Sequence, residues 1–413
     1  MKSSGVEWIG EIPEEWDVTR SKNIFTQRSS RGNDVEEQLA ATQQHGMYPQ
    51  KLLEGVVQVK EDTDLQQFKT VHKNDYVISL RSFQGGFEMS DYEGVCSPAY
   101  QVFYNTIPIS YRYYKYLFKS DGFISKMNSL TVGIREGKNI QYKDFSNSPI
   151  IIPPKSTQQR IASYLDKKCS KIEETIQNQQ QVIEKLKAYK QSLITEAVTG
   201  KIKIQNEIPD FKYCNLGFIA EFKNGLNYNA SDFGTEVKFL GVGDFQNYLA
   251  LNDESMFSNI ITDTEIEDDY YLKNGDIIFV RSNGSKELVG RAIMVDNIDF
   301  KVTYSGFCIR LRNKEPQKIN SKFLLYFFRS DHFRNELQRL SQGSNISNIN
   351  QDLLSHIKIP LVEMRFQESV IDFLNKKCTA IDTAIEQKQN LIEKLTEYKK
   401  SLIYECVTGK KEI

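Results

Sequence analysis

A chain of 413 residues is long for a single hydrophobic core, so its length favours two or more domains. Its 39% of hydrophobic residues is typical of a soluble protein, and no apolar run approaches the roughly 18 residues that a membrane-spanning helix needs. The net charge of −1 differs from the large basic excess of a simple nucleic-acid-binding protein. The N-terminus carries early acids and no apolar core, so we expect no secretory signal, and six cysteines without a CxxC pair favour a cytoplasmic protein over a disulfide scaffold or a zinc protein.

Residues 1–155 alternate short β-prone runs with turn residues. The run YVISL at 76–80, bounded by Asn, Asp and Gly turns, predicts a strand, and a polar loop follows it. The aromatic stretch YRYYKYLF at 111–118 predicts a half-buried helix, and a second polar segment lies at 135–139. These features predict a compact domain of mixed α and β structure.

Residues 156–200 predict one long helix. The stretch 157–199 contains no Pro or Gly, it begins with a capping signature after Pro153-Pro154, and Gly200 supplies a stop. Apolar residues recur at spacings of three and four for about five heptads, which is typical of a coiled-coil seam. An ordinary amphipathic helix, the alternative, would be shorter and would have a wider apolar face.

Residues 201–365 and 366–413 repeat this order. EKLKAYKQSLITEAVTGK at 184–201 returns as EKLTEYKKSLIYECVTGK at 393–410, with 13 of 18 positions identical at an offset of 209. The repeat therefore divides the chain into two variable globular segments, each followed by a closely kept helix. The expected fold class is α+β, with two mixed α/β domains separated by two long helices.

Two helices that share a seam are expected to pair, and an antiparallel pair would relate the two globular segments by a pseudo-twofold axis. That geometry suits two half-sites on one duplex, although either helix could instead pair with another protein. Polar residues interrupt both seams at matching positions, Gln179 with Lys388 and Lys190 with Lys399, and can fix the register. The predicted seam residues are Leu165, Ile172, Ile176, Ile183, Leu186, Leu193, Leu374, Ile381, Ile385, Ile392, Leu395 and Leu402.

The polar loops carry Arg, Asn and Gln, whose forked donors and acceptors match guanine and adenine edges in the major groove, and Lys, which neutralises phosphate. For any single residue an ordinary surface loop is an equal alternative, so the prediction depends on the recurrence of the loops in both halves. Residues 111–143 hold seven Lys and Arg against two Asp and Glu, and residues 310–358 hold nine against four, although chance clustering would also produce this excess. The candidate DNA-contacting residues are Arg81, Ser82, Gln84, Arg135, Lys138, Arg281, Asn283, Lys286, Asn345 and Asn348.

Two short motifs are typical of enzymes. FLGVG at 239–243 fits the FxGxG loop of S-adenosylmethionine-dependent methyltransferases, but the Asn/Asp-Pro-Pro-aromatic motif of amino methylation is missing. Pro209-Asp210 followed by Glu221 and Lys223 resembles the PD…ExK pattern of metal-dependent nucleases, but the first repeat lacks the acid and the lysine. No P-loop occurs either, so we expect no catalytic centre and no metal site in this chain.

GVEWIGEIPEEWDV at 5–18, IIIPPKSTQQRIASYLDKK at 150–168 and the two EKL…VTGK helices resemble type I restriction-modification specificity subunits. The resemblance covers essentially the whole chain, and it is specific in the helical repeats and weak in the variable segments. It implies two target-recognition domains that read the two parts of a bipartite site on double-stranded DNA. The helices between them would measure the unspecified gap.

The resemblance further implies that the chain is not catalytic and binds neither a cofactor nor a membrane. Two methyltransferase (M) subunits that use S-adenosylmethionine would dock on it, and restriction/translocase (R) subunits that use ATP and Mg²⁺ would join for cleavage. The PPKSTQQ block has only a diverged second copy, IPLVEMRFQ at 359–367, so docking at the two ends need not be equal. The competing classes are a coiled-coil scaffold whose variable domains bind proteins, and an enzyme that uses the two short motifs.

Overall fold

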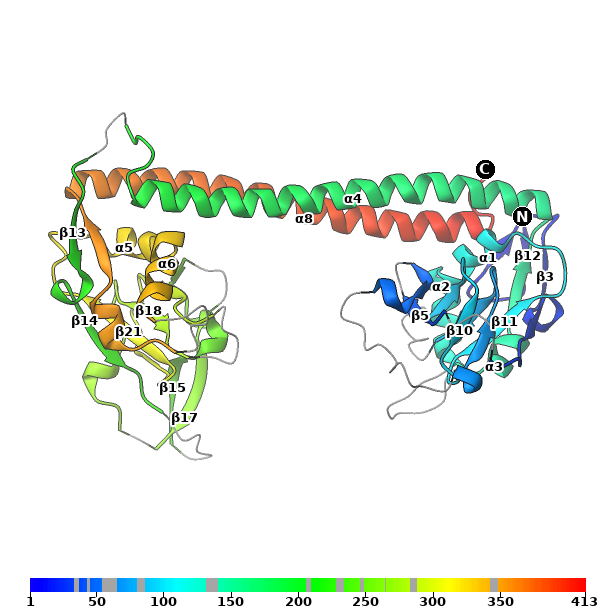
Figure 1. Cartoon of the computed structure of the whole chain (residues 1–413), viewed down its shortest axis with the longest axis horizontal. Coiled ribbons are helices and arrows are strands. Elements are labelled where there is room, and N and C mark those ends of the chain that lie inside the picture. The colour runs from blue at the N-terminus through cyan, green and yellow to red at the C-terminus, as the bar shows by residue number, and fades with distance from the viewer. Residues whose placement is uncertain are drawn as a thin grey trace. The chain divides into compact units, whose positions relative to one another are not determined.

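The structure is a computed structural model, and it divides into two compact units that we describe separately. Unit 1 contains residues 1–179 and 389–413, and unit 2 contains residues 180–388. Two helices of 44 residues each, α4 (Lys155–Val198) and α8 (Met364–Val407), contribute one part to each unit (Figure 1). In the part of the chain that the structure describes, no helix is long and apolar enough to cross a membrane. The described residues are 1–32, 37–42, 45–53, 65–79, 86–130, 140–205, 209–227, 234–245, 249–263, 265–282, 288–341 and 348–413.

Unit 1 is built on a four-stranded antiparallel sheet. Its order is β4 (Phe25–Gln27), β11 (Gln101–Asn105), β8 (Tyr76–Ile78) and β9 (Phe87–Met89). The other strands form antiparallel pairs: β1 (Lys2–Ser3) with β2 (Glu11–Ile12), β3 (Asp17–Arg20) with β12 (Pro149–Ile152), β5 (Leu39–Thr42) with β6 (Gly46–Pro49), and β7 (Lys69–Val71) with β10 (Gly94–Cys96). The helices that follow the sheet in the chain are α1 (Tyr111–Phe118), α2 (Asp121–Ser129) and α3 (Tyr142–Asn147).

The core of unit 1 is strongly aromatic. Phe25, Phe103 and Phe145 are fully buried, with ring centroids 5.4 Å apart for the first two and 4.7 Å apart for the last two. Burial of one such side chain stabilises a fold by about 1.5–3 kcal/mol, and edge-to-face contacts add to this. The predicted helix at 111–118 is confirmed as α1, which buries Tyr113 and Tyr114 against this core.

Unit 2 is built on a five-stranded sheet and a smaller sheet of three strands. The larger sheet has the order β14 (Ala220–Asn224), β21 (Cys308–Asn313), β18 (Ile277–Val280), β19 (Ala292–Val295) and β16 (Ala250–Leu251). The smaller sheet has the order β17 (Ser258–Thr262), β15 (Thr235–Leu240) and β20 (Val302–Tyr304), and β13 (Lys212–Asn215) pairs with β22 (Lys358–Leu361). The helices are α5 (Ser321–Phe328), α6 (Asp331–Leu340) and α7 (Gln351–Ser355).

The two units share one topology. The order β4-β11-β8-β9 of unit 1 matches β14-β21-β18-β19 of unit 2, and helices α1 to α3 match α5 to α7. The strand register agrees as well, because Tyr76 pairs with Phe103 where Ile277 pairs with Leu311. The internal repeat therefore extends through the variable segments, and the α+β prediction with two mixed domains and two long helices is confirmed.

Both long helices end two residues before the predicted glycine. Gly200 and Gly409 have left-handed φ values of +69° and +72°. The next N–H donates to the carbonyl five residues earlier, at 2.9 Å for Lys201 and 2.8 Å for Lys410, which is the Schellman arrangement. A Cβ atom at Gly409 would lie 2.4 Å from Cδ of Pro13, so packing as well as backbone conformation requires glycine there.

Within each unit the long helices lie side by side and run in opposite directions (Figure 1). In unit 1 the first part of α4 and the last part of α8 share a core that contains Leu165 and Leu402. In unit 2 the last part of α4 and the first part of α8 share a core that contains Leu193 and Leu374. All the predicted seam residues are buried or half-buried.

Two lysines that interrupt the seam, Lys190 and Lys399, have carboxylate partners. Lys190 donates to both oxygens of Asp382, at 2.6 and 2.7 Å, and Lys399 donates to Glu173. The repeat offset of 209 relates Lys190 to Lys399 and Glu173 to Asp382, so these ion pairs are two copies of one interaction. Because each pair joins α4 to α8, both units have the same antiparallel register.

Candidate DNA-recognition surface

Two of the ten candidate DNA-contacting residues, Arg281 and Asn348, belong to the described part of the chain. The other candidates lie outside the described residues: Arg81, Ser82, Gln84, Arg135, Lys138, Asn283, Lys286 and Asn345.

The structure brings together the described ends of the two polar segments predicted to contact DNA in the second half, Arg281-Ser282 and Asn348. Arg281 directly follows β18, and its carbonyl accepts a 2.9 Å hydrogen bond from the N–H of Ile349. Ser282 and Asn348 form an isolated antiparallel bridge next to this bond. Residues far apart in sequence therefore meet at one end of the five-stranded sheet, where both candidate loops begin or end.

The half-buried side chain of Arg281 contacts the turn between β20 and β21. Its Nη1 donates to the carbonyl of Gly306 at 3.4 Å, and its backbone N–H donates to the carbonyl of Phe307 at 2.8 Å. A guanidinium carries five N–H donors, of which the side-chain bond uses one. The guanidinium of Arg281 thus supports the turn with one N–H donor, and its other N–H donors are not used by this bond.

Unit 1 has the corresponding strand end. The N–H of Ser79, directly after β8, donates to the carbonyl of Gly86 at 2.8 Å. The candidates Arg81 and Gln84 lie between these two residues in sequence. The loop of unit 1 and the loop after Arg281 therefore leave equivalent strands, β8 and β18, at the same end.

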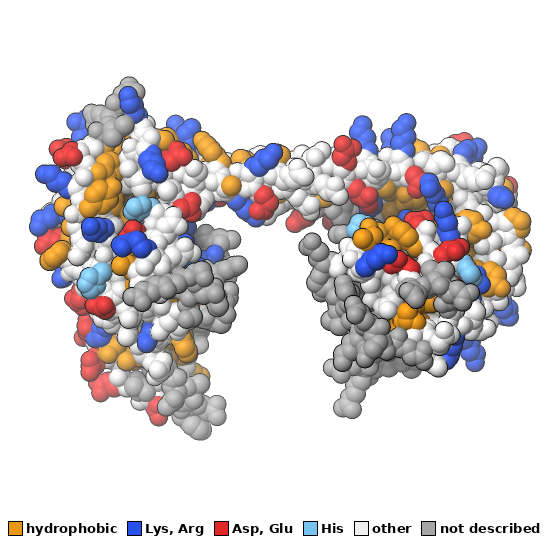
Figure 2. Space-filling view, in the orientation of Figure 1, with side chains coloured by type: hydrophobic (Ala, Val, Ile, Leu, Met, Phe, Trp, Pro, Cys, Tyr) orange, Lys and Arg blue, Asp and Glu red, His pale blue; other side chains and the backbone are white. Residues whose placement is uncertain are grey.

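Part of the local basic excess is neutralised by neighbouring acids. Charged side chains of both signs are spread over the face shown in Figure 2. In the stretch 310–358, Arg312 forms a 2.7 Å ion pair with Asp276, whose carboxylate also accepts from the N–H of Lys273. Basic residues of the two stretches that form ion pairs with carboxylates are Arg112, Lys119, Arg310, Arg312, Lys318, Lys322 and Arg339.

The residues of the nuclease-like pattern have partners within their own sheet. Glu221 accepts a 3.0 Å hydrogen bond from the fully buried Arg310, and Lys223 donates to Asp269. This bond, together with the nearby Arg310, lowers the pKa of the Asp269 carboxyl. Within the described residues, no three His, Cys, Asp or Glu side chains are placed to hold a metal ion.

The methyltransferase-like loop is closed by its own acid. The N–H of Gly241 donates to Asp244 Oδ2 at 2.7 Å, and Ser258 donates to Asp244 Oδ1 at 2.7 Å. The loop residues 242–244 form one turn of 3₁₀ helix. Asp244 therefore occupies a backbone donor that an FxGxG loop would turn toward its cofactor.

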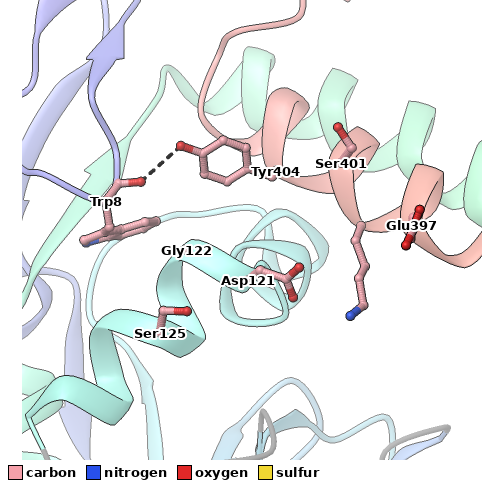
Figure 3. Close-up of a pocket in the computed structure, with 8 residues that line it drawn as sticks. Trp8, Asp121, Gly122, Ser125, Glu397, Ser401 and Tyr404 are labelled. Atoms are coloured by element: carbon pink, nitrogen blue, oxygen red, sulfur yellow. Dashed lines mark hydrogen bonds between the residues drawn. The ribbon is translucent and has the colours of Figure 1, made fainter.

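A groove of about 560 Å³ lies in unit 1 between α2 and the end of α8 (Figure 3). Trp8, Gly122 and Tyr404 form its apolar part, and the hydroxyl of Tyr404 donates to the carbonyl of Trp8 at 3.1 Å. In unit 2 the equivalents of Lys400 and Tyr404 are Gln191 and Thr195, and both bond directly to Asp331, each at 2.9 Å. The ends of the two helical repeats therefore present different surfaces in the two units.

Two buried glutamines were missed by the sequence analysis. Gln158 Oε1 accepts from the N–H of Ser110, and Gln367 Oε1 accepts from the N–H of Asn320, each at 2.8 Å. Ser110 and Asn320 precede α1 and α5, so each glutamine connects the start of a long helix to the globular part of its unit. The two glutamines are separated by the repeat offset of 209 and are identical, although the PPKSTQQ block around them has diverged. This identity was the sequence signal from which both residues could have been found.

A family model for the type I restriction modification DNA specificity domain matches residues 13–187 and 209–396. The chain is 28% identical over 311 residues to the type I restriction enzyme StySPI specificity subunit of Salmonella potsdam, which covers 73% of this chain and 65% of that protein. It is 28% identical over 291 residues to the MjaVIII specificity subunit of Methanocaldococcus jannaschii, covering 66% of this chain and 64% of that one. These matches span just under two thirds of the relatives' length.

Two solved structures share the fold. One chain, from a study of complex assembly and conformational transition of the type I R-M system, has a TM-score of 0.75 at 14% identity and covers 97% of this chain and 100% of its own length. The HsdS subunit from Thermoanaerobacter tengcongensis has a TM-score of 0.55 at 15% identity, with coverage of 97% and 98%. Because the family model covers most of both halves, the chain belongs to the family of type I restriction-modification DNA specificity subunits.

Proposed function

We propose that this chain reads a bipartite target on double-stranded DNA, with one half-site for each globular segment. The observation that carries the proposal is the repeated topology, in which the candidate loops leave equivalent strands at the same end of the sheet in both units. Two copies of one fold with different loops suit a target whose halves differ in sequence. Contacts to base edges are made by side chains, and these differ between the two units although the backbone fold is shared.

The chain acts without a catalytic centre of its own in this proposal. It docks two M subunits, which use S-adenosylmethionine to methylate adenine, and R subunits, which use ATP and Mg²⁺ to cleave DNA. The names of the relatives as specificity subunits of restriction enzymes support this division of work. The internal partners of Glu221, Lys223 and Gly241 also support it, because these groups are engaged within the fold.

An exchange of one globular segment tests the bipartite reading. Residues 201–365 are replaced by the equivalent segment of a related subunit, and methylated adenines are then mapped by sequencing the DNA of the expressing cells. One half of the recognised motif should change while the other half stays.

The reciprocal exchange of residues 1–155 is the matched control, and it should change the other half alone. If both halves or neither half changed in both exchanges, the segments would not be independent readers. A scaffold whose variable domains bind proteins would then be the better explanation.

A further inference from the structure

An exposed aromatic side chain of unit 2 lies next to the candidate residue Arg281. Phe307 is 57% exposed, although a phenylalanine is among the side chains most often buried. Its carbonyl accepts the backbone bond from Arg281, and Arg281 in turn accepts from Ile349 beside Asn348. Phe307 therefore stands where both candidate polar segments meet.

The turn that carries Phe307 is held in place from several sides. The N–H of Phe307 donates to Ser305 Oγ at 3.2 Å, and the N–H of Gly306 donates to the carbonyl of Leu226 at 2.8 Å. A Cβ atom at Gly225 would lie 2.3 Å from the carbonyl oxygen of Tyr304, so the two backbones are in close contact. A ring on such a turn can be covered by a ligand at little cost in backbone entropy.

Unit 1 has the same turn with a different side chain. The strand register relates Ser305 to Ser97 and Phe307 to Ala99. The N–H of Ala99 donates to Ser97 Oγ at 3.3 Å, in the same way as that of Phe307 to Ser305. The backbone is thus repeated, while the exposed side chain at its tip is a methyl group in one unit and a phenyl ring in the other.

Another exposed aromatic of unit 2 provides a contrast. Phe218 is 75% exposed and precedes β14, which begins opposite Asn313 at the far end of β21. Phe307 precedes the near end of β21, next to the end of β18 and Arg281. The two rings therefore lie at opposite ends of the same sheet, and only Phe307 lies beside the candidate loops.

We propose that Phe307 contacts a base in the half-site read by unit 2, through an apolar contact of its ring. The inference rests on the proposed function and adds a residue that the polar-loop reasoning did not include. Phenyl rings contact thymine methyl groups in the major groove or wedge against a base step, and both interactions discriminate sequence without neutralising phosphate. The methyl group of Ala99 is much shorter than the phenyl ring of Phe307 and cannot make this contact. The two turns have the same backbone but therefore contact their half-sites differently.

The test uses the full chain assembled with its M subunits and a duplex that carries the motif mapped by methylation sequencing. Phe307→Ala should weaken binding to this duplex by about tenfold, since contacts between a base and an aromatic ring contribute on the order of 1–3 kcal/mol. Binding to an unrelated duplex and the salt dependence should stay the same, because no phosphate contact is lost. Phe218→Ala is the matched control and should bind like the unchanged chain.

Base substitutions then locate the contact. A duplex altered at the contacted base pair has already lost the interaction, so Phe307→Ala should cost little on that duplex and about tenfold on duplexes altered elsewhere. Phe307→Gln, which keeps a side chain of similar reach, repeats the measurement in case the alanine variant fails to fold.

Three results would overturn the inference. Equal binding by Phe307→Ala and the unchanged chain, an equal loss with Phe218→Ala, or failure of both Phe307 variants to assemble with the M subunits would each exclude a base contact. The last result would instead assign the ring to a protein interface. Failure of the proposed function itself is distinguished by the segment exchange, in which the motif would then stay unchanged or change as a whole.

Discussion

Gln158 and Gln367 show how a single residue connects the closely kept helices to variable domains. Their side chains are 2% and 0% exposed, and Gln367 Nε2 also donates to the carbonyl of Val362 at 2.8 Å. A buried amide with all its groups bonded is stabilising, whereas one left without partners costs about 1–3 kcal/mol. From the sequence the start of the first helix shows only a capping signature, because local patterns cannot show that an amide reaches a loop 48 residues away in the chain.

Glu88 is a buried acid in the core of unit 1. It is 3% exposed and accepts a hydrogen bond from Lys119. The strand register relates it to Ile293 of unit 2, so the repeat would have predicted an apolar residue there. Burial raises the pKa of the Glu88 carboxyl to about 6, against the opposing effect of Lys119.

This raised pKa predicts a pH dependence of stability. Between about pH 4.5 and 6 the folded chain binds more protons at Glu88 than the unfolded chain does, so the free energy of unfolding falls as the pH rises through this window. The total change is about 2 kcal/mol. Glu88→Gln should remove it, as measured by urea unfolding of both chains at pH 4.5, 5.5 and 7. Glu93→Gln, at an exposed acid of the same unit, is the control, and a slope that persisted in Glu88→Gln would contradict the assignment.

At the scale of elements, the long helices were the most predictable part of the fold. Helix α4 begins one residue before the predicted start, and both helices are followed by the predicted glycines. A heptad pattern lies within one continuous segment of the sequence, so it predicts a helix even when the partner helix is unknown. The partners of Lys190 and Lys399 could not be read in this way, because Asp382 and Glu173 become neighbours only once the antiparallel register is known.

The ion pair between Lys399 and Glu173 can be tested by reversing its charges. Lys399→Glu places two carboxylates together and should lower the free energy of unfolding by about 1 kcal/mol, the upper range for partly exposed pairs. Adding Glu173→Lys should restore most of the loss, as measured by urea unfolding in a double-mutant cycle.

Lys394→Glu, on an exposed position of the same helix, is the control for the change in net charge. The equivalent pair in unit 2, Lys190 with Asp382, should respond in the same way. An additive double variant would show that neither pair contributes to the register.

At the scale of the whole molecule, the repeat made two domains of one topology predictable, but the sheet order within them was not. Strands β14, β21 and β18 are far apart in the chain, and pairing between distant strands leaves no periodic signal. The fully buried Arg310 on β21 illustrates the difficulty, because it stands in a strand that otherwise looks apolar and needs Glu221 on the neighbouring strand. Differences between the units, such as Phe307 and Ala99, become visible only after the shared fold aligns them.

The proposed division of work between this chain and the M and R subunits gives the last prediction. The purified chain, supplied with S-adenosylmethionine, ATP and Mg²⁺, should neither methylate nor cut DNA, and both activities should return when the M and R subunits are added. Glu221→Gln together with Lys223→Met should leave reconstituted cleavage within about twofold of the unchanged complex. The reason is that Gln keeps an acceptor for the buried Arg310, and the two side chains serve ion pairs within the sheet. Methylation by the same preparation controls for assembly and DNA binding, and a selective loss of cleavage would return the nuclease pattern to an active role.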